Sequence, residues 1–290
     1  MQSPLPIVSG VGASSRWLPP GPWKTVLEFF TEQFPRVDAE IWTTRMARGE
    51  VLDETGQRVD PSSIYRVVAC VFYYREVENE TVIPLTEHLI YRDEHILVAD
   101  KPHFLPVIPS GRFLQQTLLT RLRIKYGAET LVPIHRLDRE TAGLVMFSVN
   151  PSTTGLYTAL FRNRKVDKVY EAMGTTLDHV QLPTTRRSLI VRGEPFFRME
   201  EVPGVPNSET HIRQLSNTLY HLVPVSGRKH QLRVHLAALG IPIVNDKLYP
   251  MIRASDESDF SSPLKLLAKS ISFEDPLTGQ QRYFESGMKL

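Results

Sequence analysis

The sequence predicts an α+β fold in which helices accompany an antiparallel sheet. Residues 188–226 contain short strand patterns separated by Pro and Gly, an arrangement typical of antiparallel sheets. Residues 89–99 have the pattern of a hairpin, with Leu89–Tyr91 and Ile96–Ala99 as its strands and residues 92–94 as its turn. Apolar residues recur at helical spacing before and between these strand patterns, so both kinds of element are expected.

Length and composition indicate a folded protein without membrane spans. A chain of 290 residues suits either one large domain or a small domain joined to a larger one. Its residues are 41% hydrophobic and 23% charged, which does not suggest disorder. The chain has no run of eighteen apolar residues and no basic segment followed by an apolar one at its start, so we expect a cytoplasmic protein. Cys70, the single cysteine, is expected to be a buried thiol in a reducing compartment.

The net charge excludes a uniformly basic nucleic-acid-binding protein. Lys and Arg number 34 and Asp and Glu number 32, which leaves a formal charge of +2. Strong binders of nucleic acid are usually more basic, so any contact with RNA has to come from a local patch.

The first 75 residues predict a proline-rich arm followed by a small unit of helices and strands. Five prolines within residues 1–22 favour an extended arm. Val26, Phe29, Phe30 and Phe34 then predict one helix, and residues 38–46 predict a second one that Gly49 ends, with Ile41 and Trp42 inward. Val51 and residues 64–74 are expected to be strands, and the acidic residues 75–88 are expected to be a linker.

The middle of the chain predicts a polar loop fixed to a buried strand. Gly143 opens Leu144–Phe147, a continuous apolar run with the length and composition of a core strand. Asp138 lies on the loop directly before it, and loops held by rigid strands often carry catalytic groups. Helices are expected around Leu114–Leu122, ending at Gly127, and from Asn150–Pro151 onward, with Leu156, Ala159 and Leu160 buried; residues 166–173 are expected to be a strand.

A helix near residues 231–239 is expected to bring an arginine to Asp138. Leu232, Leu236 and Leu239 form one apolar stripe, and Gly240 ends the helix, while His230 and Arg233 share a neighbouring face. An inward guanidinium requires a carboxylate, and Asp138 is the candidate. The pairing predicts that Asp138 is ionised at neutral pH, as a nucleophile must be.

Several ordered motifs resemble the RluA group of pseudouridine synthases. His135-Arg136-Leu137-Asp138 through Leu144 is similar to H-R-L-D-x-x-T-S-G-L, with Ala142 in place of Ser. Lys168-Val169-Tyr170-Glu171-Ala172 resembles K-x-Y-x-A, and Gly227–Gly240 resembles G-R-x-H-Q-I-R-x-H-L-A-x-x-G. Asp100–Gly111, Ile241–Tyr249 and Leu267–Pro276 are similar to further family segments, with His103-Phe104 where small residues and Gly are usual and Leu267 in place of His.

This resemblance implies a fold and a domain division. The fold is a mixed, mainly antiparallel central sheet with flanking helices and a cleft across its middle, in a pseudouridine synthase domain over residues 86–290. Residues 1–85 then form the arm and a small α/β domain that is similar to an RNA-binding domain first described in a ribosomal small-subunit protein. A structural extension without RNA affinity is the alternative for this small domain.

The resemblance also implies a reaction and its residues. Specific uridines in ribosomal or transfer RNA are isomerised to pseudouridine, with Asp138 as nucleophile, Tyr170 against the base and Arg233 orienting Asp138. The target base leaves its stack, and Arg136 fills the gap. The carboxylate attacks the sugar, adds to the base, or deprotonates the sugar to form a glycal. Other expected RNA contacts are His135, Arg228, Lys229, His230, Gln231, Lys168 and Lys101.

The partners follow from the chemistry. Breaking and remaking one bond within the substrate needs no redox change and no external reactant, so we expect no cofactor, no metal and no nucleotide. RNA is the expected partner, there is no membrane partner, and the protein is expected to be a monomer.

Two other functions are kept as alternatives. His135, Asp138, His230 and His235 raise the possibility of a metal-dependent nuclease. His230 and His235 are five residues apart, however, so a straight helix turns them about 140 degrees from each other. The second alternative is an RNA-binding protein without catalysis, which incubation with bulk RNA separates from an enzyme.

Overall fold

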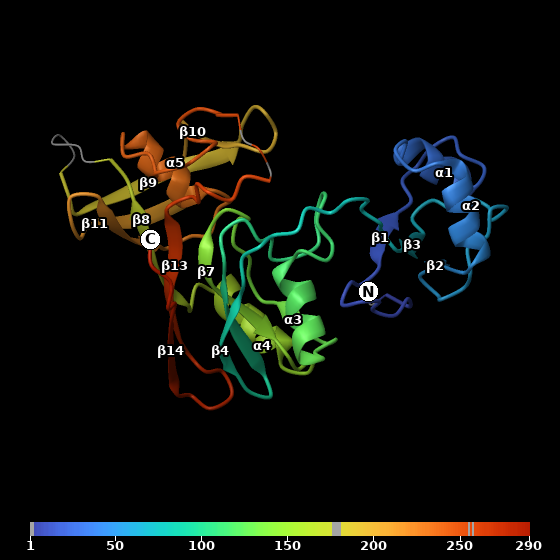
Figure 1. The fold of residues 1–290 in the computed structure, drawn as a ribbon, viewed down its shortest axis with the longest axis horizontal. Helices are drawn as coiled ribbons and strands as arrows, with labels where there is room; N and C mark the ends of the chain where they lie inside the picture. The colour runs from blue at the N-terminus through green and yellow to red at the C-terminus, as the bar shows by residue number, and fades with distance from the viewer. Residues whose placement is uncertain (1–2, 176–180, 255, 257) are drawn as a thin grey trace. The chain divides into compact units, whose positions relative to one another are not determined.

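The computed structural model describes residues 3–175, 181–254, 256 and 258–290 (Figure 1). The chain forms two compact units. The N-terminal unit consists of the chain up to Glu80 together with Gly111–Gln115, and the C-terminal unit consists of Thr81–Ser110 and Gln116–Leu290. Among the described residues, every helix is too short or too polar to cross a membrane.

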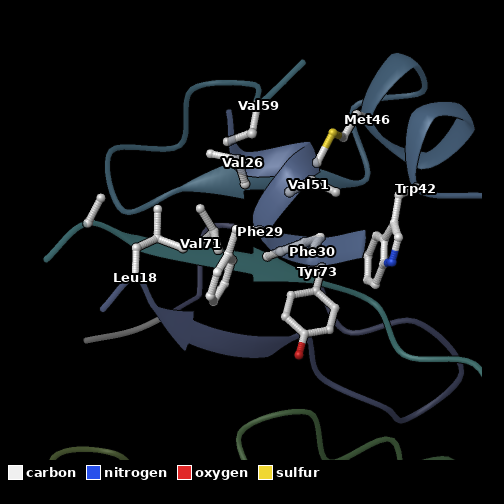
Figure 2. Packing of buried hydrophobic residues seen from close by; sticks show 11 residues of the cluster. Leu18, Val26, Phe29, Phe30, Trp42, Met46, Val51, Val59, Val71 and Tyr73 are labelled. Carbon is white, nitrogen blue, oxygen red and sulfur yellow. The ribbon is translucent and has the colours of Figure 1, made fainter. Parts of the chain in front are cut away.

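The N-terminal unit is a three-stranded sheet covered by two helices. The antiparallel strands are β1 (Ser14–Trp17), β2 (Val51–Asp53) and β3 (Cys70–Tyr73), in the order β1-β3-β2. Helices α1 (Val26–Gln33) and α2 (Ala39–Ala47) supply the largest side chains of its core, among them Phe29, Phe30 and Trp42. Figure 2 shows Phe29 and Phe30 packed between the helices and β3.

Both predicted helices of this unit and the burial of Cys70 are confirmed. Three details are wrong. Of the strand expected over residues 64–74, only Cys70–Tyr73 forms one, because residues such as Ile64 and Val68 are exposed. Residues 14–17 of the predicted arm form β1, because their backbone pairs with β3 and Leu18 is buried behind them. Ile41 is 38% exposed, because α2 turns Trp42 and Met46 toward α1 instead.

The C-terminal unit is built on one mixed sheet of eleven strands, which confirms the predicted fold class. Its main order is β10-β9-β11-β12-β8-β13-β7-β5-β4, and β14 and β6 pair with β13 and β7. The contact between β13 and β7 is parallel, and the other strand pairs are antiparallel. The strands are β4 (His88–Arg92), β5 (Ile96–Lys101), β6 (Val132–Pro133), β7 (Ala142–Ser148), β8 (Asp167–Met173), β9 (Thr184–Arg192), β10 (Met199–Val202), β11 (Ser208–Gln214), β12 (Leu219–Pro224), β13 (Leu266–Glu274) and β14 (Gln281–Glu285).

Two of the helices in this unit pack on different parts of the sheet. Helix α4 (Thr154–Arg162) places Tyr157 and Leu160 in a core formed with β5, β7, β13 and β14. Helix α5 (Gln231–Ala238) places Leu232 and Leu236 in a second core formed with β8, β11, β12 and the start of β13. Helix α3 (Leu118–Tyr126) ends at Gly127, whose φ of 59° is the left-handed conformation expected there.

The start of α4 differs from the prediction. Asn150 accepts hydrogen bonds from the backbone and hydroxyl of Ser152 and so forms a turn, and the helix begins only at Thr154. This shift rotates the helix, so Leu156 is exposed and Tyr157 is buried in its place.

Candidate active site

The candidate site lies where three strands present neighbouring residues. Gly143 on β7 pairs with Ala268 on β13, and Ala268 pairs with Tyr170 on β8. Gly143 has a φ of +109°, and a Cβ there would lie 2.3 Å from the carbonyl oxygen of Ala268. Only glycine allows β7 and β13 to approach this closely. Gly143, Ala268 and Tyr170 therefore lie side by side on β7, β13 and β8. This places Tyr170 near the point where the Asp138 loop joins β7.

The Asp138 loop is held by the last residue of β5 and by the segment that follows it. The Lys101 ammonium donates to the carbonyl oxygens of Pro102, Leu105 and Arg139 at 3.0, 2.8 and 3.0 Å. The Nδ1 atom of His103 lies 2.7 Å from the carbonyl oxygen of Glu140. Two side chains of one segment thus bind the backbone of the two residues after Asp138.

Burial and charge act in opposite directions on Lys101. Burial lowers its pKa to about 7, and the nearby carboxylates of Glu140 and Asp138 oppose this. All three N–H groups of an ammonium have a carbonyl acceptor here, so the geometry fits the charged form.

Phe104 occupies the position where the resembling family usually has glycine. Its φ of 64° lies in the left-handed region. The ring is buried and meets the Phe260 ring edge-on at a centroid distance of 5.4 Å. Burial of the ring offsets the backbone strain at this position, so the loop keeps a glycine-like bend without a glycine.

Arg233 contacts two carboxylates, and its main partner differs from the predicted one. Its Nε and Nη2 atoms each donate to Asp246 at 2.8 Å. Its Nη1 atom lies 3.8 Å from Asp138 Oδ2 and makes no hydrogen bond within the described part of the chain. The expected pairing with Asp138 is present as a long ion pair, while Asp246, which was not predicted as a partner, accepts both hydrogen bonds of the buried guanidinium. Asp138 faces the remaining nitrogen.

His230 faces Asp138 from the start of α5. Its Nε2 atom lies 3.9 Å from Asp138 Oδ1, and its Nδ1 atom is 2.9 Å from the Tyr249 hydroxyl. That hydroxyl accepts from the Met199 backbone N–H at 2.8 Å, so it can donate its own proton to Nδ1. Burial lowers the pKa of His230 to about 4, so the ring is neutral at pH 7. In this arrangement Nε2 carries the proton and directs it toward Asp138.

Tyr170 is a neutral phenol at ordinary pH. Burial raises its pKa, and the negative charge of Asp138 raises it further. The negative charge of Asp138 thus acts on the Tyr170 hydroxyl. Tyr170 can therefore donate or accept a hydrogen bond with a group beside Asp138, but it does not ionise to a phenolate.

The predicted RNA contacts divide by exposure. Arg136, Arg228 and Lys229 are exposed, and Lys168 is half-buried. Lys101 and Gln231 are buried and saturated by protein groups, so the structure places them out of reach of RNA. His135 is also directed inward, because its Nε2 accepts from the Met146 N–H at 3.0 Å and its ring stacks on Phe161 at 4.6 Å.

Asp246 and Tyr249 were not among the predicted site residues. The signal for both was present, since they lie in the segment Ile241–Tyr249 and an inward arginine demands full neutralisation. The local sequence pattern does not predict that this segment folds back onto α5.

Comparisons with known proteins show which family the chain resembles. A family model described as RNA pseudouridylate synthase matches residues 95–238. The dual-specificity RNA pseudouridine synthase RluA of Vibrio vulnificus is 35% identical over 207 residues, which cover 67% of this chain and 79% of the relative. The RluA protein of Pasteurella multocida is 30% identical and is matched over 91% of its length by 68% of this chain.

Solved structures have the same fold. Human RNA pseudouridylate synthase domain containing 1 aligns with a TM-score of 0.57 at 24% identity, over 70% of this chain and 84% of that one. Human RNA pseudouridylate synthase domain containing 4 aligns with a TM-score of 0.52 at 25% identity, over 69% and 88%.

Proposed function

Because this chain belongs to the RluA family of RNA pseudouridine synthases, we propose that Asp138 is its nucleophile and acts on a uridine that has been turned out of structured RNA. Arg233 orients the carboxylate, and Tyr170 packs against the base. The observation that carries the proposal is the Arg233 Nη1 atom, which faces Asp138 at 3.8 Å while the rest of the guanidinium is bound by Asp246.

Exposure supports the division of roles between the two carboxylates. The Asp138 side chain is 27% exposed, whereas those of Arg233 and Asp246 are 2% and 1% exposed. Asp138 is thus the carboxylate that a substrate can reach. Its Oδ2 atom lies 3.8 Å from the Arg233 Nη1 atom, which can orient the carboxylate for attack.

The proposed reaction conserves every atom of the substrate. The bond between C1′ of the ribose and N1 of uracil breaks, the base turns, and C1′ joins C5. The proton on C5 is lost and N1 gains one, so no oxidant or second substrate is consumed. Attack on the sugar, addition to the base and formation of a glycal all remain compatible with a single carboxylate.

The state of Tyr170 restricts how the C5 proton leaves. Since burial and Asp138 raise the pKa of Tyr170, its hydroxyl keeps its proton before the reaction. Tyr170 can therefore relay a proton but is a poor final acceptor. We assign it the relay from C5 to the Asp138 carboxylate once that carboxylate is free again.

Base flipping is part of the proposal. A side chain cannot reach the glycosidic bond inside a helix, and extruding a base costs a few kcal/mol, least in loops and bulges. Arg136 is exposed two residues before Asp138, which is a suitable place for a side chain that occupies the vacated position. Ribosomal or transfer RNA offers such loops.

The names of relatives favour transfer RNA as one substrate class. A Saccharomyces cerevisiae protein named tRNA pseudouridine(31) synthase is 29% identical over 244 residues, which cover 74% of this chain and 58% of that protein. We propose structured transfer or ribosomal RNA as the substrate. Mapping pseudouridines in both RNA classes from cells lacking the protein identifies the target.

The nucleophile is tested by Asp138→Asn. The amide keeps the shape of the side chain but loses the charge, so pseudouridine formation in bulk RNA should fall below detection while the RNA Kd stays within a few-fold. Asp167→Asn is the matched control, because Asp167 is exposed on β8 and its loss should leave turnover unchanged. Pseudouridine is measured by nucleoside analysis of the digested RNA.

Other outcomes have distinct meanings. Turnover by the Asp138→Asn variant would remove Asp138 from the role of nucleophile. RNA binding by the wild-type protein without pseudouridine would favour a binding protein, and RNA cleavage that a chelator stops would favour a nuclease.

A further inference from the structure

The loop between β9 and β10 presents two adjacent aromatic rings to solvent. Phe196 is 65% exposed and Phe197 is 38% exposed. Their rings meet edge to face at a centroid distance of 5.6 Å. Folding gains little from rings that stay in water, and paired exposed aromatics are typical of binding surfaces. We call Phe196 and Phe197 the aromatic pair.

Cationic side chains shape this loop. The Arg192 guanidinium lies 5.3 Å from the centre of the Phe196 ring, and its Nε donates to the Phe196 carbonyl oxygen at 3.0 Å. Lys229 donates from Nζ to the Phe197 carbonyl oxygen at 2.9 Å. Both cations are exposed, so they add positive charge around the aromatic pair.

The aromatic pair adjoins the candidate active site through a short series of contacts. Met199, two residues after Phe197, donates its backbone N–H to the Tyr249 hydroxyl, which contacts His230 at 2.9 Å. His230 in turn faces Asp138 at 3.9 Å. Lys229 precedes His230 in the chain and donates a hydrogen bond to the Phe197 carbonyl oxygen, which makes a second link between the loop and the site. Figure 1 shows β10 beside α5, in agreement with these contacts.

We propose that the aromatic pair is a stacking platform for an unpaired base of the RNA near the target uridine. This inference rests on the proposed function, because a substrate with one base turned out exposes the faces of its neighbours. Aromatic rings next to cations are the usual means of binding single-stranded nucleic acid, since every base has a face to stack and every nucleotide has a phosphate. The platform binds bases without reading their identity.

Charge favours RNA over an apolar protein partner as the occupant. Arg192 and Lys229 contact the aromatic pair, and Arg198 follows it in the chain. The carboxylates of the loop and β10 are Glu194, Glu200 and Glu201, and Glu201 is already paired with Arg186. Arg198 also lies over the ring of Tyr249 at 5.0 Å, which fixes the base of the loop to the site. A groove that tracks phosphates requires this excess of cations.

The test uses the full-length protein and a short single-stranded RNA with one uridine and 2-aminopurine beside it. Stacking on a ring quenches 2-aminopurine, so the wild-type protein should quench it on binding. Phe196→Ala should weaken the Kd by about tenfold, the value of one base–aromatic stack, and should reduce the quenching. Phe196→Trp keeps a ring and should restore both. Tyr283→Ala is the matched control, because Tyr283 is an equally exposed aromatic on β14 and its loss should change neither.

Salt dependence separates stacking from charge. Phe196→Ala removes no charge, so the slope of log Kd against log salt should stay as in the wild type, whereas Lys229→Met should lower it by about 0.7 if Lys229 meets one phosphate. Unchanged binding and quenching in Phe196→Ala and Phe197→Ala would overturn the platform.

The two proposals fail separately. A wild-type protein that makes pseudouridine while the Phe variants bind normally retains its function and loses the platform. A protein that makes no pseudouridine but loses quenching in Phe196→Ala has the platform without the enzyme.

Discussion

Arg233 is bound by one carboxylate and offers its remaining nitrogen to another. A buried guanidinium without a partner is very costly, and Asp246 removes that cost through two hydrogen bonds. Asp138 is then free to move toward a substrate without leaving a buried charge uncompensated. Had Asp138 been the sole partner, every step of its chemistry would have had to break the pair that stabilises Arg233.

Asp246 should therefore affect stability more than Asp138. Asp246→Ala leaves a buried guanidinium without its main partner and should cost about 3 to 5 kcal/mol in the free energy of unfolding. Asp138→Asn should cost less than about 1 kcal/mol, because Asp138 is partly exposed and lies beyond hydrogen-bond distance of Arg233. Urea denaturation of the C-terminal unit measures both. Equal losses for the two variants would show that Arg233 does not distinguish between the carboxylates.

At the scale of elements, local sequence patterns predicted those helices and strands that are determined by interactions between residues close in sequence. The hairpin of β4 and β5, the buried strand β7 and the helix α5 follow from apolar spacing and from turn residues. The parallel contact of β13 with β7 joins segments more than a hundred residues apart, and no local pattern encodes it. The pairing of Asp246 with Arg233 is likewise not encoded in a local pattern, because it depends on how the segment after α5 folds back onto the helix.

Gly143 is the position at which one added Cβ atom would interfere with the pairing of β7 and β13. In Gly143→Ala the new Cβ would lie 2.3 Å from the Ala268 carbonyl oxygen at a φ of +109°. Overpacking and a left-handed backbone together should cost about 2 to 5 kcal/mol and displace the Asp138 loop, so turnover should fall with stability.

The matched control for Gly143 is Gly155→Ala in α4. Nothing lies within 4 Å of a Cβ at Gly155, and alanine favours a helix, so this variant should be neutral or gain up to about 1 kcal/mol. Thermal unfolding compares the two. A Gly143→Ala protein as stable as the wild type would show that β7 and β13 can separate without loss.

At the scale of the whole molecule, histidines and tryptophans are divided between the two units. All nine histidines lie beyond residue 87 and outside residues 111–115, whereas Trp17, Trp23 and Trp42 all lie before residue 80. The positions of these residues in the sequence reveal this division, but not which histidines are buried. The structure shows that burial lowers the pKa of His135 to about 3 and those of His230 and His235 to about 4.

These histidines should make the C-terminal unit sensitive to acid. Each has a folded pKa below its ordinary value of 6.5, so the unfolded chain binds more protons between pH 6.5 and about 4. The stability they contribute is fully present above pH 6.5 and is lost as the pH falls through this window, at up to about 1.4 kcal/mol per pH unit for each histidine. Asp53 of the N-terminal unit has a pKa below 3.8, so its contribution is lost only in stronger acid.

Denaturation followed by two signals tests this difference. Tryptophan fluorescence reports the N-terminal unit, and far-ultraviolet circular dichroism reports mainly the larger C-terminal unit. Between pH 6.5 and 4 the dichroism midpoint should fall steeply while the fluorescence midpoint changes little. His235→Gln should flatten the fall by about one proton, because glutamine can still bond Thr210 and Ser208 but does not titrate. Parallel shifts of both signals would mean that the units unfold as one, and the buried histidines would then act on the whole chain.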